Sequence, residues 1–301
     1  MMSGTPMIKA AQGPGTVLQV TPRSAEWRYL SFAVVELAAG ETHRHLVDDQ
    51  ETAVVPLSGS ASLKLGSDQY WIGRQSVFTE LAPVGYAPPG TEVIVTADNG
   101  GCSFAIGSAP AEGRYPARLI EPSTIRSEVR GGGAALRQVN HTLAPPIEAE
   151  RLILYEVYVP RGTWSGWAPH RHDGVDGSPY LEEAYYFRLD RPEGFWIHRN
   201  WDDGTGYDRD EVGGPEAYEQ LMSGGDGDCA LVPGGYHSSV ACPGANMYFL
   251  NYLAGELVAE QRATPPCFHS EFTWIESDWG QGRWDLPVID PSSGSGHEVA
   301  R

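Results

Sequence analysis

Three histidines and one glutamate in the C-terminal half of this 301-residue chain have the residue types and spacing of a metal site. His170 and His172 stand two positions apart, and residues i and i+2 of a β-strand point to the same face. Both imidazoles can therefore reach one ion. We expect the remaining ligands to be Glu183, which opens the segment EAYYFRL, and His237, which follows a strand and a Pro-Gly-Gly turn.

Three imidazoles and one carboxylate suit a single borderline divalent ion, namely Zn, Mn, Fe, Co or Ni, with Zn slightly preferred. The spacing alone does not choose the metal. A lone His-x-His is more often structural, but here it is joined by an acidic strand and a later histidine. Glu182, Asp173 and Asp176 compete with Glu183, because a ligand from the 173–182 loop is not bound by strand parity.

The elements that must position these residues are short β-strands. Glycine and proline supply 36 and 23 residues, which indicates frequent turns. The segments between these turns are rich in Val, Ile, Tyr and Phe and predict strands at 29–37, 52–65, 92–97, 152–160 and 246–255. The best helix candidate is 215–222, and the tail after about residue 275 is expected to be loose. The fold class is therefore all-β, a sandwich or a barrel.

The chain divides into two halves of similar pattern. THRH at 42–45 and PHRH at 169–172 each precede an acidic residue and a β-rich segment, which suggests a duplicated barrel. A stretch of turn-forming and charged residues at 130–150 separates them. We predict an N-terminal barrel over 1–135 and a C-terminal, metal-binding barrel over 136–301.

The formal charge of −18 argues against nucleic acid and membrane surfaces as partners. A small anion could still bind if a metal or an arginine supplied a local cation. The four scattered cysteines form no Cys-x-x-Cys pair, and we see neither a secretion signal nor 18 consecutive apolar residues. A soluble, cytoplasmic protein is expected. Pairing of barrel edges makes a homo-oligomer possible.

The order His-x-His, Glu, Pro-x-Gly-x(1–2)-His resembles the two motifs of the cupin superfamily, although ten residues separate His172 from Glu183 where cupins usually have three or four. The segments 155–173, 181–189 and 231–255 more specifically resemble the 5-deoxyglucuronate isomerases of myo-inositol catabolism, bicupins related to the 4-deoxy-5-ketouronate isomerases. The resemblance implies two tandem jelly-roll barrels, with His170, His172, Glu183 and His237 as ligands.

The N-terminal half departs from the cupin pattern. It offers His43, His45 and possibly Glu51, but the segment 81–93, where a further histidine would stand, reads LAPVGYAPPGTEV. We expect a degenerate barrel that supports folding or association, and the sequence leaves open whether His43 and His45 hold a metal weakly.

The resemblance implies an aldose–ketose isomerase of carbohydrate metabolism that converts 5-deoxy-D-glucuronate to 5-dehydro-2-deoxy-D-gluconate by proton transfer through a metal-stabilised enediolate. Glu183 could shift between ligand and catalytic base, and a metal-bound water or another carboxylate could also be the base. Strand alternation places Tyr185 on the face of Glu183 and Tyr186 on the other face, so Tyr185 could bind a sugar hydroxyl. Arg188 could bind the substrate carboxylate, although parity turns it away from Glu183 unless the strand bulges.

Two other functions remain open from the sequence. A site of three histidines and one glutamate could serve an Fe or Ni dioxygenase, which oxygen uptake would reveal. A non-catalytic, sugar-binding bicupin would keep its role without His172.

Overall fold

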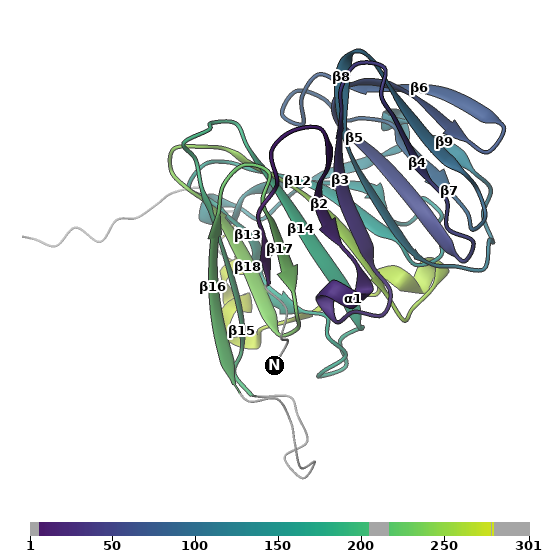
Figure 1. Cartoon of the computed structure of the whole chain (residues 1–301). Coiled ribbons are helices and arrows are strands. Elements are labelled where there is room, and N and C mark those ends of the chain that lie inside the picture. Colours follow the sequence, from purple (N-terminus) through teal and green to yellow (C-terminus); the bar gives the residue numbers. More distant parts are fainter. Residues whose placement is uncertain (1–5, 205–216, 278, 280–301) are drawn as a thin grey trace, which may run out of the picture.

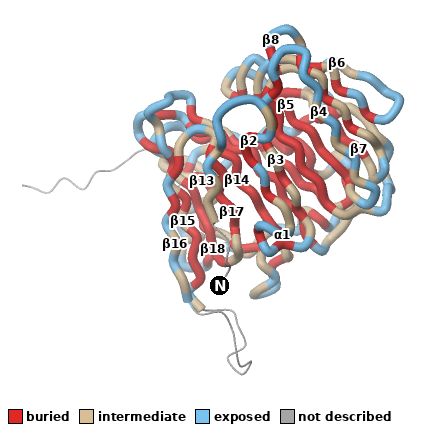
Figure 2. Tube along the Cα trace, in the orientation of Figure 1, coloured by how far each residue is buried: buried red, intermediate tan, exposed pale blue. Residues whose placement is uncertain are grey.

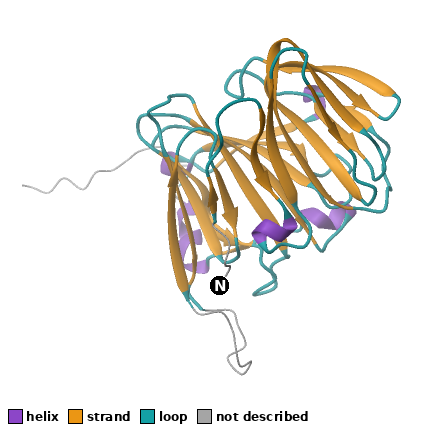
Figure 3. Ribbon diagram, in the orientation of Figure 1, coloured by secondary structure: helices purple, strands orange, loops and turns teal. Residues whose placement is uncertain are grey.

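The structure is a computed structural model that describes residues 6–204, 217–277 and 279 (Figure 1). The described chain forms three antiparallel β-sheets, and its short helices lie in the connections (Figure 3). The prediction of an all-β fold is confirmed. The helices are α1 (Pro22–Ala25) and the 3-10 turns η1 (Pro122–Thr124), η2 (Gly133–Ala135), η3 (Ala259–Ala263) and η4 (Ser270–Ser277).

One eight-stranded sheet forms the N-terminal barrel. Its two longest strands, β5 and β8, pair along most of their length, and register shifts at Pro56/Ser58 and Gly59/Ala61 bend them. Gly59 has φ +76°, and a Cβ there would lie 2.2 Å from the carbonyl oxygen of Gly101, so the bend requires glycine. The strands are β2 (Gly15–Val20), β3 (Ser31–Leu37), β4 (Thr42–His45), β5 (Gln50–Leu65), β6 (Asp68–Arg74), β7 (Val84–Ala87), β8 (Val93–Pro110) and β9 (Arg118–Ile120).

Two facing sheets form the C-terminal barrel. The seven-stranded sheet has the order β1-β17-β14-β19-β12-β11-β10, and the five-stranded sheet has the order β16-β15-β18-β13-β20. The first contains β1 (Met7–Ile8), β10 (Arg126–Arg130), β11 (Arg137–Leu143), β12 (Ile153–Val159), β14 (Leu181–Leu189), β17 (Cys229–Val232) and β19 (Met247–Gly255). The second contains β13 (Trp164–Arg171), β15 (Trp196–Asp202), β16 (Tyr218–Gly224), β18 (Tyr236–Ala241) and β20 (Cys267–Phe268).

The change from one barrel to the other falls between β9 and β10. The β10–β11 hairpin already belongs to the seven-stranded sheet, with Arg126 opposite His141 and Arg130 opposite Arg137. The first strand also belongs there, because Met7 and Ile8 pair with β17. The predicted division after residue 135 therefore falls within the β10–β11 hairpin.

The two barrels share an apolar core. Alternate residues of β14 and β19 point away from the C-terminal barrel, and Tyr186 and Tyr252 pack on Phe32 of the N-terminal barrel, with ring centroids 6.2 and 5.1 Å apart. Their neighbours Tyr185 and Phe187 point into the C-terminal barrel. Figure 2 shows buried positions continuing across the strands from one barrel into the other. A strand buried on both faces explains why β19 is apolar along nearly its whole length.

Buried carboxylates also connect the barrels by accepting backbone N–H groups. Glu182 accepts from residues 28–30 at 2.6–2.9 Å, and Glu51 accepts from residues 150–152 at 2.6–2.8 Å. Each carboxylate thereby satisfies three amides of a loop from the other half of the chain. Glu51, considered above as a possible N-terminal ligand, serves this structural purpose and also accepts from the Tyr86 hydroxyl at 2.6 Å.

An ion pair with no exposed side-chain surface completes the junction. Arg74 of the N-terminal barrel donates through Nη1 to Glu156 of the C-terminal barrel. The Tyr248 hydroxyl donates to the same carboxylate oxygen at 2.6 Å, and Arg74 Nη2 donates to Tyr158 at 3.0 Å. The attraction of the opposite charges and these hydrogen bonds compensate for the removal of Arg74 and Glu156 from water.

The five predicted strands are all present and correspond to β3, β5, β8, β12 and β19. The helix predicted at 215–222 is wrong for its described part, because Tyr218 to Met222 belong to the edge strand β16. Pairing with β15 and the contact of Glu219 with Arg199 at 2.9 Å override the local helical pattern. Residues 215 and 216, and nearly all of the tail predicted to be loose, lie outside the described residues.

Candidate metal centre

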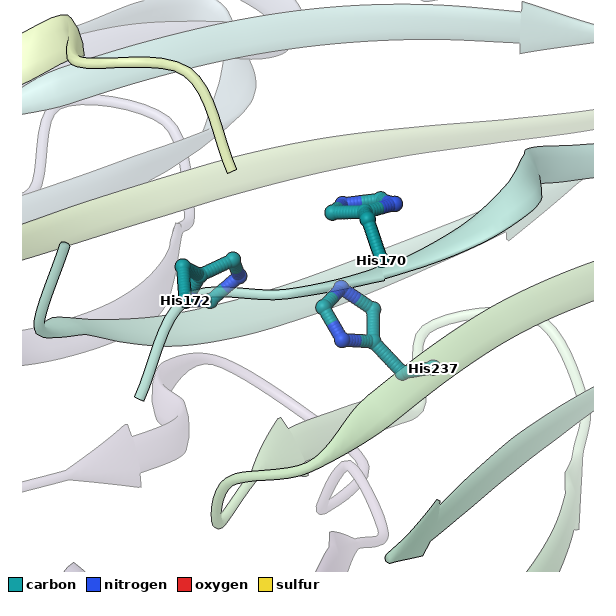
Figure 4. Close-up of side chains that lie close together, drawn as sticks. All are labelled: His170, His172 and His237. Atoms are coloured by element: carbon teal, nitrogen blue, oxygen red, sulfur yellow. The ribbon is translucent and has the colours of Figure 1, made fainter. Parts of the chain in front are cut away.

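The three predicted histidines meet inside the C-terminal barrel. His170 on β13 lies directly opposite His237 on the neighbouring strand β18, and His172 follows two residues after His170. The close-up shows the three rings gathered between these strands (Figure 4). One nitrogen from each ring lies within 4.8 Å of the others, and within the described part of the chain this is the one group of histidine, cysteine or acidic residues so arranged.

Glu183 approaches the histidines from the opposite sheet. It lies on β14, and its Oε2 is 2.8 Å from His172 Nε2 and 3.2 Å from His237 Nε2. Ligand atoms bound to one ion at roughly 2.0–2.2 Å stand about 3.0–3.5 Å apart, so these separations are close to those of a coordination shell. The histidines thus come from β13, the residue that follows it and β18 in the five-stranded sheet, and Glu183 comes from β14 in the seven-stranded sheet.

The tautomer of His172 follows from its other contact. Nδ1 lies 2.9 Å from the carbonyl oxygen of Leu181, which can only accept, so Nδ1 carries a proton. In the neutral ring, Nε2 then presents a lone pair toward the Glu183 carboxylate. A proton or a metal ion must lie between two such electron-rich atoms.

The other two histidines have buried nitrogens without hydrogen bonds in the described structure, His170 Nδ1 and His237 Nδ1, whereas His237 Nε2 has the 3.2 Å approach of Glu183 Oε2 described above. Burial lowers the pKa of His170 and of His237, and for His170 the other two histidines lower it further. Neutral rings with free lone pairs are what a metal requires. The donor set and these unsatisfied nitrogens therefore fit a divalent ion.

Glu183 is kept ionised. Burial would raise its pKa, but the contacts with His172 and His237 outweigh burial and hold the pKa well below its ordinary value. For His172 burial acts to lower the pKa, yet the Glu183 contact leaves it raised. The ionised carboxylate of Glu183 and the imidazoles that contact it thus stabilise one another.

Two of the carboxylates that competed with Glu183 are engaged elsewhere. Glu182 faces the N-terminal barrel, where it accepts three backbone N–H groups. Asp173 accepts from Arg171 at 2.9 and 2.7 Å and from the Gly235 amide at 2.6 Å. Strand parity therefore holds across the ten-residue loop, and Glu183 is the carboxylate that faces the histidines.

A cavity of about 680 Å³ opens beside the histidines, within the ordinary range for a small-molecule site. His170, His172 and Glu183 form part of its wall, and Tyr185 lines it as parity predicted. The structure does not bring Arg188 to this cavity. Arg188 lies beside Leu57 and Phe78 of the N-terminal barrel and donates through Nε to Asp226 at 2.7 Å, a position that does not fit the predicted role.

Three polar residues near the site were missed from the sequence. Asn251 lines the cavity with a buried Nδ2 that lacks a partner in the described structure, and Arg137 lines it from β11. His198 stacks on His237 with centroids 5.8 Å apart and bonds Ser239 Oγ at 2.8 Å. Alternation along β19, which puts Asn251 on the face of Phe249 and Leu253, is the signal that could have revealed Asn251.

The N-terminal histidines do not form a comparable cluster among the described residues. His45 Nε2 lies 3.1 Å from Ser108 Oγ, and the His43 ring packs edge-on against Phe104 at 5.6 Å. With Glu51 bound to backbone amides, the described N-terminal half brings no third ligand to these histidines.

The helices in the described part of the chain are too short or too polar to span a bilayer.

Two joined β-barrels, one of which gathers three histidines and a glutamate, define the class of protein as a bicupin. The structure resembles a solved oxalate decarboxylase of Lactobacillus farciminis, with a TM-score of 0.58, 11% identity, and coverage of 86% of this chain and 89% of that chain. At this identity the likeness shows the fold.

The chain belongs to the KduI/IolB family, whose model matches residues 6–275. It is 36% identical over 245 residues to the 5-deoxy-glucuronate isomerase of Geobacillus kaustophilus, covering 80% of this chain and 85% of that protein. The corresponding isomerase of Bacillus subtilis strain 168 is 28% identical over 260 residues, covering 82% and 89%. An IolB-like protein from Salmonella typhimurium LT2 has a TM-score of 0.81 and 32% identity, covering 90% and 99%.

Proposed function

We propose that this protein is a metal-dependent aldose–ketose isomerase of myo-inositol catabolism that converts 5-deoxy-D-glucuronate to 5-dehydro-2-deoxy-D-gluconate. The observation that carries the proposal is the cluster of His170, His172, His237 and Glu183 beside a cavity, in a chain whose relatives are named as isomerases of this substrate. The family likeness supplies the substrate, and the cluster supplies a site able to do the chemistry.

The reaction moves hydrogen between two adjacent carbons. The proton on C2 of the aldose leaves, the electron pair forms an enediolate, and a proton is added at C1, while the hydroxyl proton on O2 is transferred to O1. A divalent ion held by the four residues would act as a Lewis acid toward the substrate oxygens as negative charge develops there. No electrons leave the substrate, so neither O₂ nor a redox cofactor is consumed.

The residues of the chain have separate roles in this proposal. Glu183, ionised because its pKa is lowered, serves as a ligand and is the candidate base if it shifts toward the substrate. Tyr185 stays protonated because burial raises its pKa far above the ordinary value, so its hydroxyl can donate to a sugar oxygen. The apolar residues Val157, Phe249 and Leu253 line the cavity and limit the access of water to the enediolate.

The experiment incubates metal-loaded protein with 5-deoxy-D-glucuronate in D₂O and follows the reaction by NMR. We expect loss of the C2 proton signal and formation of the keto acid, both abolished when the metal is removed and restored when it is returned. Absence of exchange and of keto acid with a fully loaded protein would reject the isomerase. Consumption of O₂ during turnover would instead show a dioxygenase.

A further inference from the structure

The cavity beside the metal centre has more arginines than carboxylates in its wall, where the acidic residues are Glu183 and Glu276, although the protein as a whole is acidic. Arg126, Arg130 and Arg137 all line it, whereas the chain as a whole has a formal charge of −18. An anion that enters this cavity therefore meets three guanidinium groups near a cluster of histidines. The question is which of the three is available to bind it.

Arg126 and Arg130 already have a carboxylate partner. Glu128 Oε1 lies 3.6 Å from Arg126 Nη2 and 2.5 Å from Arg130 Nη2, and it also contacts His141 at 2.8 Å. About half of each arginine side chain is exposed, 55% and 46% respectively. These two residues lie at the solvent-exposed edge of the sheet, where their charges are shared and screened.

Arg137 differs from Arg126 and Arg130 because it is less exposed and has no carboxylate partner among the described residues. Nη1 donates to the carbonyl oxygens of Ala135 at 3.1 Å and Trp167 at 3.3 Å, and no carboxylate in the described structure lies within ion-pair distance of it. Burial, followed by the charge of Arg130, lowers the pKa of Arg137 to about 10, so the group is still a cation at neutral pH. A largely buried guanidinium with no counter-ion is costly unless a ligand supplies one.

The position of Arg137 also places its charge close to the metal centre. The Trp167 carbonyl that holds it is three residues before His170 on the same strand, and Arg137 and His170 line the same cavity. The two backbone carbonyls fix one nitrogen of the fork. Within the described residues, Nε and Nη2 make no hydrogen bond, which leaves donors for a bidentate carboxylate.

We propose that Arg137 is the residue that binds the carboxylate of the substrate, and that it thereby orients the aldehyde end toward His170, His172 and Glu183. The proposal rests on the proposed function for the identity of the sugar acid. It identifies a specificity-determining contact: the cavity selects uronates over neutral sugars because only a carboxylate compensates the Arg137 charge.

The test measures binding by isothermal titration, which does not depend on turnover. One ligand is the alcohol obtained by reducing the aldehyde of 5-deoxy-D-glucuronate, which keeps the carboxylate but cannot isomerise. The other is the corresponding deoxyhexitol, in which a hydroxymethyl group replaces the carboxylate. Wild-type protein, Arg137→Gln and Arg137→Lys are compared, each loaded with metal. Arg199→Gln is the matched control, because Arg199 is also on a strand but pairs with Glu219 outside the cavity.

We expect Arg137→Gln to weaken binding of the carboxylate ligand by about 10- to 100-fold, as for loss of hydrogen bonds to a charged group, and to leave the deoxyhexitol within twofold of wild type. Arg137→Lys keeps the charge but loses the fork, so it should recover part of the affinity. Arg199→Gln should match wild type with both ligands. In turnover, the loss in Arg137→Gln should appear mainly as a higher KM.

Unchanged affinity for the carboxylate ligand in Arg137→Gln would overturn the proposal, as would an equal loss for both ligands, which indicates a structural role. If Arg137→Gln does not fold, Arg137→Lys decides by the same comparison, and full retention of affinity for the carboxylate ligand overturns the proposal. The outcome is separable from the proposed function. Wild-type protein that binds the carboxylate ligand through Arg137 yet isomerises nothing would reject the activity alone.

Discussion

Replacing Glu156 by Gln should destabilise the junction of the two barrels by about 3–5 kcal/mol. Glu156 and Arg74 both have side-chain exposures of 0%, so the variant leaves a guanidinium without its counter-charge in the interior. The isosteric amide can still accept a hydrogen bond, which isolates the effect of charge from that of shape. The Tyr248 hydroxyl, which donates to the carboxylate at 2.6 Å, loses a strong acceptor at the same time.

The corresponding change in melting temperature follows from the size of the chain. An unfolding entropy of about 2.1 cal/mol/K per residue gives about 0.6 kcal/mol/K for the whole chain, so Tm should fall by about 5–8 °C. Thermal unfolding followed by circular dichroism measures this shift. The matched control is Glu92→Gln, which breaks the Arg44–Glu92 pair, 3.1 Å long with side chains 64% and 45% exposed. That surface pair should contribute at most about 1 kcal/mol, a shift below about 2 °C.

A second variant separates an unpaired charge from a lost contact. Replacing Arg74 by Met together with Glu156 by Leu removes both charges and should recover part of the lost Tm, because no uncompensated guanidinium remains. The reasoning would be refuted if Glu156→Gln melted within 2 °C of wild type, or if Glu92→Gln lowered Tm by as much.

Two further predictions concern the metal. Glu183→Gln should lose most of its bound metal after dialysis, measured by elemental analysis, whereas Asp176→Asn in the preceding loop should retain it, and equal retention in both would show that Glu183 is not a ligand. A chelator should lower the Tm of the loaded wild-type protein by about 6–7 °C if metal was present at about 1,000 times its Kd, because about 4 kcal/mol of binding free energy is lost. The same chelator should leave His172→Ala unchanged, and an equal shift in that variant would mean that the stabilising metal binds elsewhere.

The sequence was sufficient for features that depend on local periodicity. The two-residue period of a strand correctly placed Tyr185 on the inner face of β14 and Tyr186 on the outer face. The same period aligned His170 with His172, and the turn before His237 returned it to the neighbouring strand. These predictions succeed because a strand buried in a closed barrel cannot slip by one residue without exposing its core side chains.

The sequence was insufficient where function depends on which strands become neighbours. Arg137 lies 33 positions before His170, in a stretch of glycines and charges that has the composition of a linker. In the structure that stretch forms the β10–β11 hairpin and adds a wall to the cavity. Arg188 looked suitable because it is near Glu183 in sequence, but its parity places it against Asp226 on the opposite face. The spacing of residues along the chain does not determine which strands pair in a sheet.

The pair Glu182 and Glu183 shows what the N-terminal barrel contributes to the site. The two residues are adjacent on β14 and must point to opposite faces. Glu182 is fixed by three backbone amides of the N-terminal barrel, at residues 28–30, and by the Tyr180 hydroxyl at 3.2 Å. Because that anchor fixes the start of β14, Glu183 is held facing His172 at the end of a ten-residue loop. The N-terminal half thus stabilises the geometry of the site through hydrogen bonds to a residue that never faces the cavity.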